Sequence, residues 1–181
     1  RGLIQDERKA DPERPAIRWP YAQNPRGRAD LRRLLADDRP AVTSFVFPPG
    51  TELGWVSACN PALGLLIGYL WKTAEYPWLN IWRRSVEGRP EARGLEFGTT
   101  GLHKPFPELV RKGCILDTPL SLYIDAGQTI RKSYLVFLAR IPTDFNGVGD
   151  LRRKGSSIIL RERGKSSRRT VRVEGVWPDK S

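Results

Sequence analysis

Residues 76–83 read Tyr-Pro-Trp-Leu-Asn-Ile-Trp-Arg, and the interpretation of the whole chain starts from their alternation. Successive side chains of a β-strand point to opposite faces of its sheet. The stretch therefore predicts a strand whose one face carries Trp78, Asn80 and Trp82. The opposite face is aliphatic, which suits a core.

The chain on either side of this strand also reads as β-structure. After a turn at residues 87–90, residues 93–98 (RGLEFG) alternate again. Upstream, residues 42–47 and 54–59 predict strands that end at Pro48 and Asn60. Residues 63–71 form a long apolar run that predicts a strand covered on both faces, and its two glycines and the flanking Pro61 count against the alternative of a buried helix. Further strands are predicted at residues 120–124, 133–139, 156–161 and 170–173, with a hairpin turn at 164–167 between the last two. Many strands with frequent turns predict an all-β fold, an antiparallel β-sandwich, as one domain over residues 1–181.

The N-terminal part is expected to be less regular. Residues 1–18 are charged, contain two prolines and predict a linker or loop. A turn is expected at residues 24–27. The stretch from Asp30 to Leu35 predicts a short helix capped by Asp30, which Pro40 keeps short.

Charge is distributed unevenly along the chain. The formal net charge is +11, and residues 146–181 hold ten Lys/Arg against four Asp/Glu. A basic end of this kind can bind nucleic acid, or can be the charged outer side of a solvated edge hairpin. The strands lack the signatures of common nucleic-acid-binding β-folds, so nucleic acid is an unlikely partner.

Several other classes of protein are disfavoured by composition. No apolar run approaches the ~18 residues of a membrane-spanning helix, so no membrane partner is expected. Cys59 and Cys114 do not form a C-x-x-C pair, and His103 is the chain's single histidine. No metal site and no cofactor is therefore expected. Spacing alone leaves a disulfide between the two cysteines open, and free, buried thiols are the favoured prediction.

The best candidate for chemistry is Glu96. Its neighbours on the same face of the predicted strand are Gly94 and Gly98, which leave space around the carboxylate. Indoles, amides and carboxylates suit sugars, which combine apolar C–H faces with hydroxyl edges. The same pattern also fits a core stripe of aromatic residues beside a solvated glutamate, and alternation alone leaves both interpretations open.

Three segments together resemble a known family: residues 60–71, 76–82 and 93–99. They are similar to the C-terminal half of the galactose mutarotase-like (aldose 1-epimerase) superfamily, nearest to uncharacterised bacterial aldose-epimerase-like proteins. The likeness covers about residues 17–140 and includes an upstream Arg-Trp-Pro-Tyr segment at 18–21. It implies a sandwich of the supersandwich type. Because the sequence starts at Arg1 and contains no Met, we expect an incomplete domain that lacks N-terminal strands.

The resemblance also implies a function and a site. Glu96 matches the glutamate that acts as general base on the anomeric hydroxyl of a hexose or related sugar. The family's general acid is a histidine from the earlier half of the domain, and His103 does not match it. Sugar contacts are expected from Trp78, Asn80, Trp82 and Arg93. The implied activity is anomer interconversion in the full-length protein.

Two alternatives to this function remain. One is a non-catalytic carbohydrate-binding module that uses the same residues for recognition only. The other is a basic nucleic-acid-binding β domain. Both a cytoplasmic and a secreted location fit the sequence.

Overall fold

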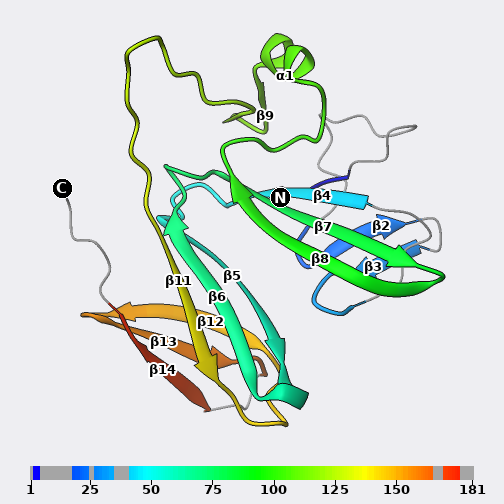
Figure 1. Cartoon of the computed structure of the whole chain (residues 1–181), viewed down its shortest axis with the longest axis vertical. Coiled ribbons are helices and arrows are strands. Elements are labelled where there is room, and N and C mark those ends of the chain that lie inside the picture. The colour runs from blue at the N-terminus through cyan, green and yellow to red at the C-terminus, as the bar shows by residue number, and fades with distance from the viewer. Residues whose placement is uncertain (1, 5–17, 25–26, 35–40, 165–168, 176–181) are drawn as a thin grey trace. The chain divides into compact units, whose positions relative to one another are not determined.

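A computed structural model describes residues 2–4, 18–24, 27–34, 41–164 and 169–175 (Figure 1). The chain divides into two compact units, where the sequence predicted a single domain. Unit 1 contains residues 1–52 and 73–131, and unit 2 contains residues 53–72 and 132–181. Both are built of antiparallel sheets, and the predicted all-β, sandwich-like fold is confirmed.

The centre of unit 1 is a four-stranded antiparallel sheet (Figure 1). In the order of the sheet, its strands are β1 (Gly2–Ile4), β4 (Ala41–Val46), β7 (Trp78–Val86) and β8 (Arg89–Gly98). A two-residue turn joins β7 to β8, with positive φ at Glu87 (49°) and Gly88 (73°). Such a turn matches the twist of a tight hairpin and fixes the register of the two strands.

One face of this sheet carries Phe45, Leu79 and Ile81, all nearly fully buried. The ring of Trp19 makes an edge-on contact with Phe45, at a centroid distance of 5.5 Å. Trp19 leads into a hairpin of β2 (Tyr21–Asn24) and β3 (Gly27–Asp30), which agrees with the turn predicted at residues 24–27.

Two expectations for the N-terminal part need correction. Residues 2–4 form β1 and pair with β4, so the predicted linker does not begin at the first residues. Residues 5–17 lie outside the described part of the chain. Residues 31–34 form a turn and a bend instead of a helix, because Asp30 pairs with Tyr21 in the β2–β3 hairpin. The rest of the predicted helix, from residue 35, is also outside the described residues.

The other face of the sheet is partly covered by the segment that follows β8. This segment contains α1 (Phe106–Lys112), β9 (Cys114–Ile115) and β10 (Thr118–Pro119). The sequence interpretation had placed no helix there. The buried cluster that joins it to the sheet consists of Val46, Trp78, Leu102, Leu109, Ile115 and Leu120.

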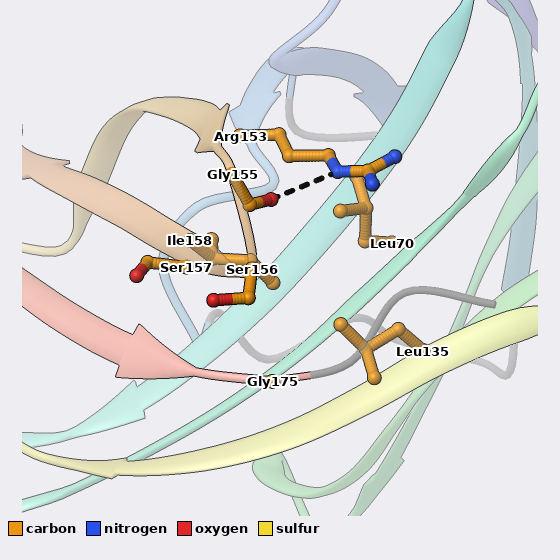
Figure 2. A pocket seen from close by; sticks show the side chains of 8 residues that line it. All are labelled: Leu70, Leu135, Arg153, Gly155, Ser156, Ser157, Ile158 and Gly175. Carbon is orange, nitrogen blue, oxygen red and sulfur yellow. Dashed lines mark hydrogen bonds between the residues drawn. The ribbon is translucent and has the colours of Figure 1, made fainter. Parts of the chain in front are cut away.

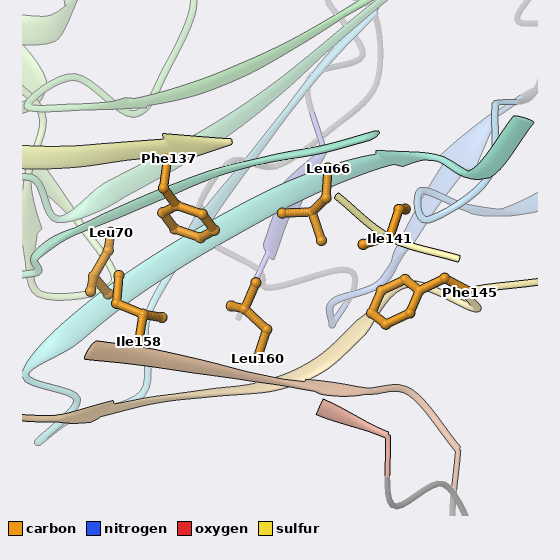
Figure 3. Packing of buried hydrophobic residues seen from close by; sticks show 7 residues of the cluster. All are labelled: Leu66, Leu70, Phe137, Ile141, Phe145, Ile158 and Leu160. Atoms are coloured by element: carbon orange, nitrogen blue, oxygen red, sulfur yellow. The ribbon is translucent and has the colours of Figure 1, made fainter. Parts of the chain in front are cut away.

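Unit 2 is a small two-layer sandwich. The first sheet has the order β11 (Tyr134–Arg140), β6 (Leu65–Lys72), β5 (Leu53–Asn60), and the short 3-10 helix η1 (Pro61–Leu63) connects β5 to β6. The second sheet has the order β12 (Val148–Lys154), β13 (Ser157–Glu162), β14 (Thr170–Glu174). Figure 3 shows the core between the two sheets, formed by Leu66, Leu70, Phe137, Ile141, Phe145, Ile158 and Leu160.

Most predicted strands are present, and two differences stand out. The strand predicted at residues 120–124 is wrong: the described chain there has no strand partner, and Leu122, Tyr123 and Ile124 are exposed. Strand β12 was not predicted. The turn predicted at 164–167 falls largely outside the described residues, although β13 and β14 do pair as a hairpin would.

Cys59 and Cys114 are both free thiols. Cys59 is half-buried, and burial raises the pKa of its thiol. Cys114 is exposed, so the prediction of two buried thiols is wrong for this residue.

Within the described ranges, no helix has the length and apolar character that a membrane crossing needs.

Candidate functional site

The candidate site lies on the β7–β8 ribbon of unit 1. Asn80 is directly opposite Glu96, and the two tryptophans of β7 are each opposite a glycine of β8. Residues that are opposite each other in an antiparallel pair project from the same face. Trp78, Asn80, Trp82 and Glu96 therefore share one face of the sheet, as the alternation of the two strands predicted.

Trp78 is part of the core of unit 1. Its side chain is 0 % exposed, and its Nε1 donates a hydrogen bond to the carbonyl oxygen of Pro119 at 2.7 Å. Gly101 packs directly on the indole, since a Cβ at that position would lie 1.8 Å from Cδ2 of Trp78. The sequence predicted a sugar contact from Trp78, but the buried indole is not accessible to a ligand. Residues 101–120 form a second layer over this end of the ribbon, and strand alternation carries no information about such a layer.

Asn80 connects the sheet to the chain that follows β8. Its Oδ1 accepts a hydrogen bond from Ser44 Oγ at 2.7 Å, and its Nδ2 donates one to the Thr100 carbonyl at 2.9 Å. Ser44 itself is 0 % exposed. The amide of Asn80 thus fixes the start of the covering segment and has less capacity left for a ligand.

Arg93 lies on the opposite face from Glu96. It is directly opposite Arg83, which is buried. The guanidinium of Arg93 donates from Nη1 to the Leu31 carbonyl and from Nη2 to the Arg33 carbonyl, the latter at 2.6 Å. The structure therefore separates Arg93 from the other four predicted site residues. Its observed contacts hold the turn that follows β3.

The part of the ribbon next to this covered end, which we call the open end, lies in the middle of both strands and contains Glu96, Trp82 and Gly94. Glu96 is exposed and Trp82 is half-buried. A Cβ at Gly94 would lie 2.5 Å from Glu96 Oε1 and 3.2 Å from Trp82 Cβ. The carboxylate of Glu96 thus lies over the bare backbone of Gly94, next to Trp82. This arrangement can accept hydrogen bonds from hydroxyl groups and can present part of an indole to an apolar ligand surface.

His103, the chain's single histidine, is exposed in the loop between β8 and α1. Within the part of the chain that the structure describes, no three His, Cys, Asp or Glu side chains form a group that could hold a metal ion.

A small pocket in unit 2 was not anticipated from the sequence. Figure 2 shows its lining, which includes Leu70, Leu135 and Ile158 on the apolar side and Arg153 with the β12–β13 turn on the polar side. Arg153 Nε donates to the Gly155 carbonyl at 3.2 Å. The pocket has room for about one water molecule, which is far too small for a sugar ring.

Comparisons with family models, with curated proteins and with solved structures found no match for this chain. The function proposed below therefore depends on the geometry of this face and on the sequence resemblance described above.

Proposed function

We propose that this chain binds a carbohydrate at the open end of the β7–β8 ribbon, with Glu96 and Trp82 as the main contacts. One observation carries the proposal: the exposed Glu96 carboxylate lies over Gly94 and beside the half-buried indole of Trp82. The ligand is a hexose or a related sugar.

The chemistry of these two side chains fits a sugar. A carboxylate accepts hydrogen bonds from two hydroxyl groups, and such charge-assisted bonds are about twice as strong as neutral ones. An indole supplies apolar contact area for the C–H face of the ring. Because Gly94 has no side chain, the Glu96 carboxylate can lie over its backbone beside Trp82, so the two groups are close enough to contact one ring.

The resemblance to the galactose mutarotase superfamily extends the proposal to catalysis. In anomer interconversion, a base removes the proton from the anomeric hydroxyl and an acid delivers a proton to the ring oxygen. By this resemblance, Glu96 corresponds to the base. Because the chain's single histidine does not match the acid, we place this activity in a full-length protein that supplies the acid.

Binding is tested by titrating the chain with galactose and glucose while following its NMR amide signals. Glu96→Gln keeps the shape of the side chain but removes its charge, and we expect sugar affinity to fall about tenfold. Glu91→Gln is the matched control, since Glu91 is an exposed carboxylate of the same strand that pairs with Arg84 at 2.6 Å. Equal affinities for the parent and Glu96→Gln would refute a sugar site at Glu96.

Catalysis is tested separately, by exchange NMR between the α- and β-anomers in the presence of the full-length protein. We expect faster exchange than in buffer, and loss of the acceleration in Glu96→Gln. Saturable binding without faster exchange would instead identify a non-catalytic carbohydrate-binding module.

A further inference from the structure

The outer face of the β12–β13–β14 sheet in unit 2 is rich in arginine. Leu160 and its cross-strand neighbours Leu151 and Val171 point toward the core of the unit. Side chains one position along each strand point the other way. By the register of the three strands, that outer face carries Asp150, Arg152, Lys154, Ser157, Ile159, Arg161, Thr170, Arg172 and Glu174.

This face has an excess of positive charge and its cations are accessible. It carries four cationic side chains, of Arg152, Lys154, Arg161 and Arg172, against the two carboxylates of Asp150 and Glu174. The side chains of the three arginines are 76 %, 56 % and 66 % exposed for Arg152, Arg161 and Arg172. Exposed ion pairs are weak, so the two carboxylates neutralise the face only in part.

Two of the arginines are oriented by one shared carboxylate. Asp150 Oδ2 lies 2.9 Å from Arg152 Nε and 3.5 Å from Arg161 Nη2. Each guanidinium has five N–H donors, and these contacts use one nitrogen of each. Each guanidinium therefore keeps further N–H donors from which a second anion could accept.

The third arginine is held by a buried hydroxyl. Ser157 is 2 % exposed, and its Oγ accepts hydrogen bonds from Arg172 Nε at 3.1 Å and Nη2 at 2.8 Å. The same Oγ donates to Glu174 Oε2 at 2.7 Å. Arginines that are already ordered lose less conformational entropy when they bind a ligand.

We propose that this face of unit 2 binds an anionic polysaccharide, whose carboxylate or sulfate groups the arginine forks recognise. A sheet face with spaced guanidinium groups complements a chain of spaced anions. A single-stranded nucleic acid fits less well, because its bases stack on aromatic side chains and this face carries none. The arginine face belongs to unit 2, so its ligand is independent of the sugar proposed at Glu96 in unit 1.

The test is binding of the whole chain to heparin, with neutral dextran and a charge-matched oligothymidylate as comparison ligands. Arg152→Gln/Arg161→Gln is expected to weaken heparin binding about tenfold. Arg84→Gln/Arg111→Gln removes the same charge from unit 1 and is the control, with an expected change below about twofold. Arg152→Lys/Arg161→Lys keeps the charge but loses the forks, and we expect an intermediate loss.

Each outcome of the heparin test either supports or overturns the proposal. Equal losses in the two Gln variants would mean that heparin responds to net charge and would overturn the proposal. Tighter binding of the oligothymidylate than of heparin would assign the face to nucleic acid. Circular dichroism of each variant checks that the sheet is intact, and Glu96→Gln should bind heparin like the parent whether or not the sugar site of unit 1 exists.

Discussion

Two neighbouring parts of the β7–β8 ribbon carry the same pair of residues, a tryptophan opposite a glycine, and differ in what covers them. At the covered end Trp78 is opposite Gly98, fully buried beneath residues 101–120. At the open end, in the middle of the two strands, Trp82 is opposite Gly94 and remains half-exposed beside Glu96. The comparison teaches that alternation assigns a side chain to a face, whereas a distant segment decides whether that face is core or surface.

The largest expected effect is at the covered end. Trp78→Ala removes a fully buried indole and leaves the Pro119 carbonyl without its donor, so we expect a loss of about 3–5 kcal/mol in the free energy of unfolding. Urea denaturation followed by circular dichroism measures this loss. Trp82→Ala is the control and should cost about 1 kcal/mol. Similar losses for the two variants would remove the distinction between the ends.

The next effect tests how tightly the covering layer packs. Gly101→Ala would place a Cβ 1.8 Å from the Trp78 indole, and both groups must then shift, at a cost of about 1–3 kcal/mol. Gly98→Ala is the matched control on the ribbon itself. Its Cβ would meet nothing closer than 3.8 Å, so we expect a change within about 0.5 kcal/mol. A Gly101→Ala variant as stable as the parent would show that the cover is loose.

Asn80 lies between the two Trp–Gly pairs, opposite Glu96, and its hydrogen bonds hold the start of the covering segment. Asn80→Ala leaves Ser44 Oγ and the Thr100 carbonyl without a partner amide, and we expect a loss of about 1 kcal/mol in unfolding free energy. Ser44→Ala breaks only one of the two bonds and should cost less. The opposite order of the two variants would mean that the Thr100 contact contributes nothing.

The smallest effect on stability is expected at the open end. Gly94→Ala would bring a Cβ within 2.5 Å of Glu96 Oε1, which ends a flexible, exposed side chain that can move away, and 3.2 Å from Trp82 Cβ, which must shift slightly. We therefore expect a loss below about 1 kcal/mol in unfolding free energy, together with weaker sugar binding because the carboxylate is displaced. Destabilisation as large as that of Gly101→Ala would show that the open end is packed after all.

Local sequence was sufficient to predict most of the strands. The β-branched and aromatic residues of 42–47 and the alternation of 76–83 reflect the two faces of a sheet, and both strands are present. Helix α1 could also have been recognised. It has Pro107 at its start, Glu108 in its first turn, Lys112 in its last and Gly113 after it, the usual signals of a helix with defined ends.

The candidate site was predictable only in part. The shared face of Trp82 and Glu96 follows from alternation once the two strands pair. The burial of Trp78 does not, because its cover comes from residues 101–120. Arg93 could not be placed either, since its guanidinium donates to carbonyl groups about sixty residues away along the chain. Strand β12 was missed because its charged outward residues hide the two that pack inward, Val148 and Leu151.

The interleaved layout of the chain has a consequence for protein synthesis. The chain leaves unit 1 after Glu52, forms β5 and β6 of unit 2, and returns to unit 1 at Thr73. There, Thr73 N donates a hydrogen bond to the Glu52 carbonyl at 3.0 Å. This hairpin is complete at Lys72, yet β13, whose Ile158 and Leu160 cover its apolar side, begins only at Ser157. At ordinary translation rates that delay is roughly 4–17 seconds. During this interval Leu66 and Leu70 of the nascent hairpin are exposed to solvent. We therefore expect the hairpin to bind a chaperone at the ribosome.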